Sequence, residues 1–484
     1  MKPPFIVIAV SLCAVAVVRG QEADTPPPAA PGVRDAYLST QLKDFPHDAN
    51  GFLKPEIWDI VAAEAKLRPG TNEERILLER KVMKDFYATY KDWKEPEPTP
   101  VAPGKLRNLP DIPKTPRFPL TDKVWPEKTG DTSICLWEDD KLAAMSLGVD
   151  DNCATDLPYW KELSKKYGGL NITWNLIVDN IDGALEKGRG PMAGSWATWK
   201  EMLNEGYHLA SHSMTHNHDP VPADGWPGPD WEAAESQHLI DSHLPGHKTR
   251  FRALPGSGVH AFGILSVGSV PFSTWRPSLV KYYAGARGAG GQALNQANMI
   301  DYFCIHATVA VGTILDNKDP KYAQYQIMNL FDADPKSRFH NFYRGWANIF
   351  IHFINNGKDF DKNPGTIAYG KMLGFYNDHR ADLWTGYFDD VGLYAEERDT
   401  ATVATNSASD KSIVFTLTDK MDPAMYDYPL TVKVRLPSTW KNTVARQGGK
   451  TLSSQVIAHE GASFALVKAM PDRGQVTLTP ASAK

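Results

Sequence analysis

Residues Ala143–Asn152 (AAMSLGVDDN) form an apolar run that ends in two adjacent aspartates, and the prediction of the fold begins from this run. It reads as a β-strand that delivers both carboxylates to one edge of a sheet. Because successive side chains of a strand face opposite ways, Asp150 and Asp151 can serve different purposes at that edge. One carboxylate can bind a metal ion while the other stays free to accept a proton.

A second stretch, His212–His216 (HSMTH), adds two imidazoles four residues apart. At this spacing the two rings fall on one side of a helical turn. Two histidines and one carboxylate are the ligand set of a hydrolytic metal site that leaves a position open for water. An aspartate pair alone is more often a solvated turn, and two such histidines alone more often lie on a surface or in a core. Together, in this order, the stretches predict a metal site.

These residues resemble motifs of the polysaccharide deacetylases of carbohydrate esterase family 4, the NodB homology group. The first stretch stands for that family's T-F-D-D-G, and the second matches its H-(S/T)-x-x-H in full. The resemblance implies that Asp150 is the catalytic base and that Asp151, His212 and His216 hold the metal. Zinc is the metal expected, although a mixed nitrogen and oxygen site also accepts cobalt or nickel.

Two later motifs extend the resemblance over about residues 131–398. Phe251–Gly256 (FRALPG) is similar to the family's F-R-P-P string, whose arginine, here Arg252, would orient the base and keep it ionised. The sequence IFIH, which ends at His352, is similar to the closing L-x-x-H motif and makes His352 the general acid. His306, which follows another apolar run, is the alternative for that role.

The chain departs from the family pattern in two places. Asn152 replaces the usual glycine, at a position that often needs a positive φ, which asparagine tolerates better than most residues. The usual aspartate-tryptophan motif is not evident. Both departures support an alternative function, a glycan-binding protein that has lost turnover, although a binder has no need of a spare base. A third reading is a small-molecule amide hydrolase, which the export signal and the C-terminal region argue against.

Alternating patterns from residue 131 onward predict an α/β domain with a parallel sheet. Active groups at the C-terminal ends of strands suit a barrel mouth. The resemblance implies a distorted (β/α) barrel of NodB type over residues 121–402, with a long insert between Gly256 and Trp346. The elements expected from the pattern are the strands Leu142–Val149 and Ile172–Val178 and the helices Tyr159–Tyr167 and Trp196–Glu205.

Flanking regions surround this domain. Residues 34–94 carry two amphipathic helical stripes and form a helical extension, in which a loop near Gly51 lacks two key ligands of a calcium site. Residues 95–120, rich in proline, form a semi-rigid linker. Residues 403–484 hold short β-branched runs separated by turns, which predict a small β-sandwich that either binds glycan or covers the barrel.

The amino terminus reads as an export signal. Its apolar run, Phe5 to Val18, is shorter than the roughly 20 residues of a spanning helix, and small residues for cleavage follow it. Residues 1–20 are the expected signal peptide and residues 21–33 a flexible lead, with a membrane anchor as the alternative. The protein is therefore expected to be secreted or periplasmic, without stable membrane insertion. Three cysteines remain after cleavage, an odd number that does not indicate a disulfide framework.

Composition narrows the function further. A chain of 484 residues should hold more than one domain, and a net charge of −5 gives no support to nucleic-acid binding. Its 14 Trp, 18 Tyr and 19 Phe include side chains suited to stacking on sugar faces. The resemblance, together with the export signal, implies a secreted, metal-dependent hydrolase that removes N- or O-linked acetyl groups from a polysaccharide. The sequence predicts neither the polymer nor the oligomeric state.

Overall fold

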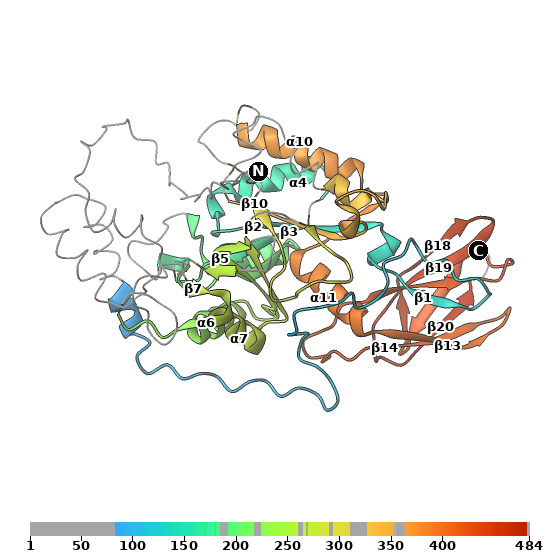
Figure 1. Ribbon diagram of the computed structural model, residues 1–484, viewed down its shortest axis with the longest axis horizontal. Coiled ribbons are helices and arrows are strands. Elements are labelled where there is room, and N and C mark those ends of the chain that lie inside the picture. The colour runs from blue at the N-terminus through green and yellow to red at the C-terminus, as the bar shows by residue number, and fades with distance from the viewer. Residues whose placement is uncertain are drawn as a thin grey trace, which may run out of the picture.

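The computed structural model describes residues 83–481 apart from 170, 180, 184–191, 217–223, 260–264, 268–269, 290–293, 310–326, 353, 355–361 and 363 (Figure 1). The expected signal peptide, the flexible lead, most of the helical extension and the calcium-like loop lie outside these residues. Of the extension, residues 83–88 form a helical turn whose aromatic side chains pack on Trp231. None of the described helices is long and apolar enough to cross a membrane.

A curled, mostly parallel sheet forms the centre of the molecule. Its main strands run in the order β10-β11-β2-β3-β4-β5, with β8 beside β5 and β12 beside β2. β2 is buried along its whole length, as expected where a parallel sheet is covered on both faces. The strands are β2 (Ala143–Val149), β3 (Ile172–Leu176), β4 (His208–Ser211), β5 (Phe251–Val259), β8 (Gly285–Ala289), β10 (Thr308–Val309), β11 (Trp346–Ile351) and β12 (Leu383–Thr385), with the short β6 (Leu265–Val267), β7 (Val270–Pro271) and β9 (Leu294–Asn295) at its margins.

The curled sheet is a half-barrel. Among the described residues, a single bridge between Arg287 and Ile305 joins β8 to the segment that leads into β10. A full NodB barrel, which the resemblance implies, is therefore not confirmed. The strands expected at Leu142–Val149 and Ile172–Val178 are present as β2 and β3.

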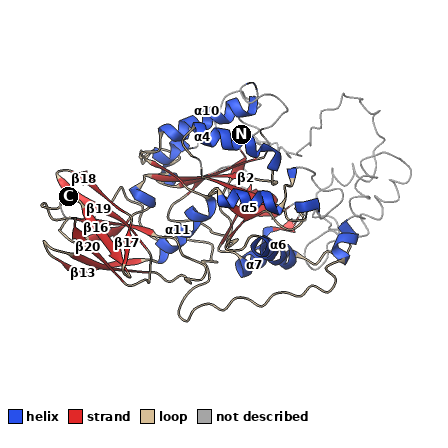
Figure 2. Cartoon of the chain, turned by 180° about the vertical axis from the view of Figure 1, so that it is seen from behind, coloured by secondary structure: helices blue, strands red, loops and turns tan. Residues whose placement is uncertain are grey.

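Helices cover the sheet on two sides, with α4 and α10 on one and α6 and α7 on the other (Figures 1 and 2). The expected helices are present as α4 and α5, and Ser195 caps α5 in a capping box with Thr198. Gly370 lets α10 pack closely against Tyr167 at the end of α4, because a Cβ at Gly370 would lie 3.0 Å from the Tyr167 hydroxyl. The helices are α4 (Leu157–Lys166), α5 (Trp196–Asn204), α6 (Pro229–His243), α7 (Phe272–Tyr282), α10 (Pro364–Asp378) and α11 (Phe388–Thr400).

Two antiparallel sheets follow at the C-terminus. One has the order β1-β15-β19-β18 and the other β13-β14-β20-β16-β17. Along β14, buried residues alternate with partly exposed ones, which is the pattern of a sheet packed on one face. The strands are β1 (Thr132–Ile134), β13 (Thr402–Ala408), β14 (Ile413–Thr418), β15 (Leu430–Arg435), β16 (Thr443–Gln447), β17 (Lys450–Leu452), β18 (Ser454–His459), β19 (Ala462–Ala469) and β20 (Gln475–Pro480).

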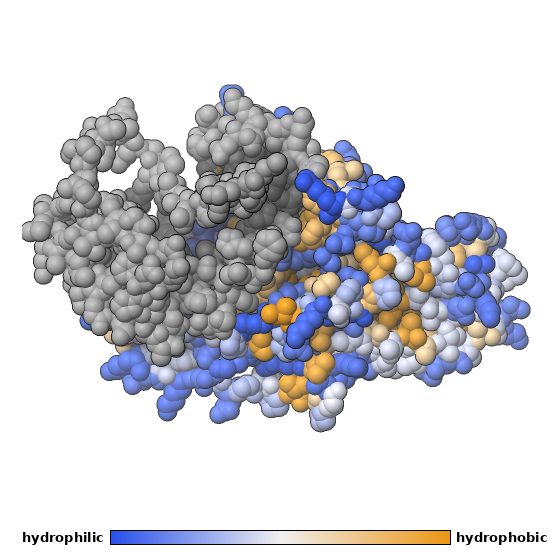
Figure 3. Space-filling view, in the orientation of Figure 1, coloured by the Kyte–Doolittle hydropathy of each residue, from blue (hydrophilic) through white to orange (hydrophobic). Residues whose placement is uncertain are grey.

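The first strand of this C-terminal part precedes the parallel sheet in the chain. β1 pairs antiparallel with β15, so the chain passes through the C-terminal sheets before it forms the parallel sheet and returns to them afterwards. No pattern in the sequence predicts this strand. On the face shown in Figure 3, the described surface is mostly hydrophilic and its apolar residues lie in small groups.

Candidate metal centre

The three predicted metal ligands converge at the C-terminal ends of β2 and β4. Asp151 follows β2, and His212 and His216 follow β4. The Oδ1 atom of Asp151 lies 3.5 Å from Nε2 of His212 and 3.2 Å from Nε2 of His216. One ligand atom from each residue fits within 4.8 Å of the others, which is the spacing of a set that shares one ion.

The hydrogen bond of the buried His212 decides how this set can be charged. Nδ1 of His212 lies 2.9 Å from the carbonyl oxygen of Ala253, so Nδ1 carries the proton and donates it. In the neutral ring, Nε2 then presents a lone pair to the carboxylate of Asp151. Two such electron-rich atoms repel unless a cation lies between them, either a metal ion or a second proton on the ring. A carbonyl that fixes the tautomer in this way is typical of metal-binding histidines, so the residues fit a zinc-type ion.

The His212–His216 segment is not helical, contrary to the expectation of a helical turn. Ser213 and His216 have φ values of 76° and 55°, in the left-handed region. The amide of His216 donates to Oγ of Ser213 at 2.8 Å, and the amide of Ser213 donates to Oγ of Ser211 at 3.1 Å. The two imidazoles therefore meet through an irregular loop held by serine side chains, with their ring centres 4.9 Å apart.

Asp150 is buried beside this set, and its two oxygens have different surroundings. Oδ1 accepts hydrogen bonds from the guanidinium of Arg287 and from Nδ2 of Asn175, the latter at 2.8 Å. Oδ2 faces Nε2 of His212 at 3.8 Å. Burial by itself raises the pKa of Asp150, but the positive charges of Arg287, His212 and His352 more than offset it and hold the pKa below its ordinary value. Asp150 is therefore an ionised carboxylate with one oxygen turned toward the ligand set.

Gly148 gives these two donors the room that they need. A Cβ at this position would lie 3.0 Å from Nδ2 of Asn175 and 3.7 Å from Nη2 of Arg287. The first distance is too short for unstrained packing. A side chain at Gly148 would push the donors away from the carboxylate that ends the same strand.

The arginine that contacts Asp150 is Arg287 on β8, and not Arg252 as the motif indicated. In the ladder, Arg252 is in register with Ser211 and Ala286, whereas Ala253 is in register with Arg287. Residues in register face the same way and neighbours along a strand face opposite ways, so Arg252 points to the other face. Its guanidinium lies 5.7 Å from the ring of Trp275, and its nitrogens have no hydrogen-bond partner among the described residues.

The structure separates the two candidates for the general acid. His352 directly follows β11, whose Ile351 carbonyl accepts the amide proton of Asp150 at 2.8 Å. It is also one of the groups that lower the pKa of Asp150. The backbone of His306 is instead bracketed by the side chain of Asn295 at 2.8 and 2.9 Å. Of the two histidines, the structure brings His352 to the ligand set.

The turn after β2 explains the asparagine in the first motif. Asn152 has a φ of 61°, in line with the expectation of a positive value. Its side chain accepts the amide proton of Ile177 at 2.7 Å and donates to the carbonyls of Ile177 and Ala193. Asn152 therefore ties the turn to the end of β3, which a glycine could not do. The buried thiol of Cys153 donates to the carbonyl of Asp150.

A second group of histidine and aspartates lies at the opposite end of β4. His208 begins that strand, and its Nδ1 lies 2.9 Å from both carboxylate oxygens of Asp389. Burial lowers the pKa of His208, but Asp389 and Asp390 more than offset this and raise it above its ordinary value. The ring also stacks on Tyr387 at 3.7 Å. No motif of the sequence indicates this group, in which the raised pKa of His208 favours an imidazolium paired with Asp389.

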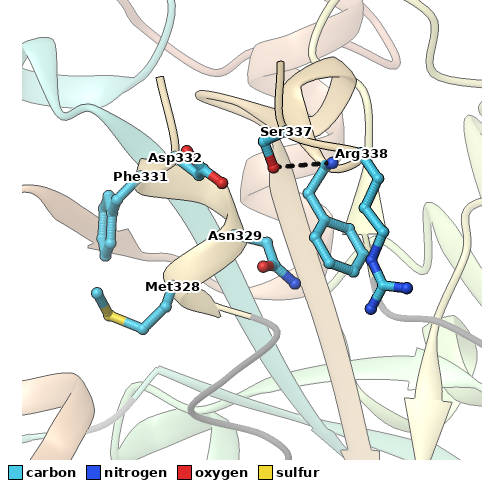
Figure 4. Close-up of a pocket in the computed structure, with 7 residues that line it drawn as sticks. Met328, Asn329, Phe331, Asp332, Ser337 and Arg338 are labelled. Carbon is cyan, nitrogen blue, oxygen red and sulfur yellow. Dashed lines mark hydrogen bonds between the residues drawn. The ribbon is translucent and has the colours of Figure 1, made fainter. Parts of the chain in front are cut away.

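A separate pocket of about 490 Å³ lies on the segment before β11 (Figure 4). The amide of Arg344, just before that strand, bonds to the carbonyl of Leu330 beside the pocket. His352 follows the other end of the same strand. The pocket is therefore separate from the ligand set. Its lining residues are Met328, Asn329, Phe331, Asp332, Ser337, Arg338 and Phe339.

Comparison with known proteins gives one similar sequence and several distant folds. No family model matches the chain. A gellan lyase from a Bacillus species is 30% identical over 398 residues, which are 78% of this chain but only 14% of that protein. The chain thus spans about a seventh of the length of that relative.

The similar solved structures are distant. One is a mutant of BA3943, a pseudoenzyme of carbohydrate esterase family 4 with restored activity, with 13% identity and a TM-score of 0.32 over 52% of this chain and 68% of that one. Another is the peptidoglycan deacetylase PdaC from Bacillus subtilis, with 12% identity and a TM-score of 0.29 over 52% of this chain and 90% of that one. These scores are too low to carry a functional argument.

Proposed function

We propose that this protein is a secreted or periplasmic, metal-dependent hydrolase that removes acetyl groups from a polysaccharide. The observation that carries the proposal is the convergence of Asp151, His212 and His216 beside an ionised Asp150. A binding protein needs neither a lone pair fixed toward a carboxylate nor a second, separately held carboxylate. A bound divalent ion, zinc by its donor set, would polarise the acetyl carbonyl and acidify a bound water.

The residues of the chain divide the proton transfers between them. Arg287 and Asn175 occupy Oδ1 of Asp150, which leaves Oδ2 to accept a proton from the attacking water. His352, as an imidazolium on the adjoining strand end, donates a proton to the departing nitrogen or oxygen. Because nearby positive charges hold the pKa of Asp150 below its ordinary value, the base is ionised and ready to accept that proton.

The similarity to a gellan lyase supports a polysaccharide as the substrate class and also favours a second candidate, a polysaccharide lyase. A lyase eliminates across the glycosidic bond and leaves an unsaturated sugar, without water as a reactant. Deacetylation releases acetate and leaves the chain length unchanged. The two reactions are therefore distinguished by their products.

The test uses the full chain with chitin, peptidoglycan, xylan, algal glycans and gellan as substrates. Acetate release that needs added zinc, and that Asp150→Asn abolishes, is the expected result. Unsaturated sugar ends without acetate would replace the proposal with the lyase. If neither product forms while the chain still binds glycan, the protein is the glycan-binding protein that its departures from the family pattern support.

A further inference from the structure

We propose that Glu232 on α6 is a positioning residue that sets the geometry of the metal-binding loop, an inference that rests on the proposed metal site. Glu232 is fully buried at the start of the helix that follows the loop. It belongs to none of the motifs that predict the site. Its carboxylate nevertheless makes most of its hydrogen bonds to the segment between the two histidine ligands.

Four donors surround this carboxylate. Oε2 accepts the amide protons of Met214 at 3.0 Å and of Thr215 at 3.1 Å. Oε1 accepts the Thr215 hydroxyl at 2.5 Å and Nε1 of Trp226 at 3.0 Å. An ionised carboxylate has about four acceptor positions, so Glu232 uses all of them. Three of these four hydrogen bonds come from Met214 and Thr215, the adjacent residues in the middle of the loop.

The loop needs such an anchor because it has no regular hydrogen bonding of its own. Ser213 and His216 adopt left-handed backbone angles, which cost energy for residues other than glycine and persist only where surrounding contacts fix them. Hydrogen bonds to a charged acceptor are stronger than neutral ones. Glu232 therefore fixes the turn that brings His216 back to within 3.2 Å of Asp151.

Arg252 gives this arrangement its charge balance. Burial lowers the pKa of Arg252. Tyr283 and Glu232 oppose this effect and favour the charged form of the arginine. The motif arginine that does not reach Asp150 thus acts on the other carboxylate of the site. Arg252 is a buried cation whose charge this carboxylate favours, although its nitrogens have no hydrogen-bond partner among the described residues.

The experiment compares zinc affinity of the full chain, by competition with a chromogenic chelator, in the wild type and in two variants. Glu232→Gln keeps the shape but turns one acceptor into a donor, so it cannot satisfy all four N–H and O–H groups. Trp226→Phe removes one hydrogen bond from the same carboxylate without touching the loop. We expect Glu232→Gln to bind zinc roughly 10- to 100-fold more weakly, and Trp226→Phe to stay within about threefold of the wild type.

The outcomes separate this inference from the proposed function. If the wild type and Glu232→Gln bind zinc with equal affinity, the proposed role of Glu232 is wrong and the proposed metal site stands. If the wild type binds no zinc, the proposed function fails, and hydrogen exchange of the metal-free protein decides the inference. Faster exchange of the Met214 and Thr215 amides in Glu232→Gln supports it, and unchanged exchange refutes it. If Glu232→Gln does not fold, Thr215→Val replaces it in both measurements, because this variant removes the hydrogen bond from the Thr215 hydroxyl to Glu232.

Discussion

Arg287 and Asp150 form a buried ion pair between strands that are not neighbours in the chain. Arg287 comes from β8 and Asp150 from the end of β2, and both side chains are almost fully excluded from solvent. Arg252 cannot take this place, because the register turns its side chain to the other face of the adjacent strand β5. The pair determines which oxygen of Asp150 is free to act.

The first prediction concerns this pair. Arg287→Met should lower deacetylation sharply and destabilise the fold by about 3–5 kcal/mol, since it leaves a buried carboxylate without its cation. Arg252→Met, assayed in zinc-saturated protein, should not show the same loss of turnover, because Arg252 does not contact Asp150. Turnover with a matched acetylated substrate and chemical denaturation measure both effects. Equal losses of turnover in the two variants would contradict the assignment of Arg287.

The second prediction concerns the metal ligands. The wild type should hold about one divalent ion per chain, and His212→Ala or His216→Ala should lose it. His208→Ala, in the ion pair at the other end of β4, is the matched control and should keep it. Metal analysis after dialysis, with circular dichroism as a check of folding, measures this. Full occupancy in both ligand variants would show that the ion, if any, lies elsewhere.

The third prediction separates the two aspartates. Asp150→Asn should keep the metal and lose activity by on the order of 10² to 10⁴, the usual cost of removing a general base. Asp151→Asn should weaken metal binding first, and part of its activity should return at high zinc. Metal titrations and rates at saturating zinc distinguish the two. The reverse result would exchange the roles of these residues.

The fourth prediction concerns the general acid. His352→Ala should slow amides and alkyl esters much more than activated aryl acetates, because a phenolate departs without a proton. His306→Ala should show no such selectivity, since His306 is not among the groups whose charge lowers the pKa of Asp150. The ratio of the two rates is compared for each variant. Leaving-group dependence in His306→Ala alone would move the acid to the other histidine.

The fifth prediction concerns pH. Because the pKa of His208 is raised in the folded protein, its ion pair with Asp389 stabilises the fold fully below the unfolded pKa of about 6.5, and this stabilisation is lost as the pH rises through the folded value. The stability difference between the wild type and His208→Gln should therefore shrink from pH 6 toward alkaline pH. Urea unfolding of the metal-free proteins across this range measures it. A difference that grows with pH would show that His208 is neutral in the fold.

Several features of this protein were determined by the sequence itself. The apolar run that ends in Asp150 and Asp151 specifies β2 and places both carboxylates at its end, because strand length and periodicity are local properties. Local sequence patterns also predict the helices α4 and α5 and the strands of the C-terminal sheets. The order of the aspartate and histidine stretches was enough to predict that one carboxylate and two imidazoles lie at the same edge of the sheet.

Only the tertiary structure decided which residues support those groups. A shift of one residue along a strand turns a side chain to the opposite face, so a motif could not tell Arg252 from Arg287. The packing of α6 brings Glu232 to the histidine loop. β1 pairs with β15, although the whole parallel sheet lies between them in the sequence. Such contacts arise between segments that are distant in the chain, and no local pattern records them. The sequence thus predicted the candidate metal ligands and base, and long-range packing determined their surroundings.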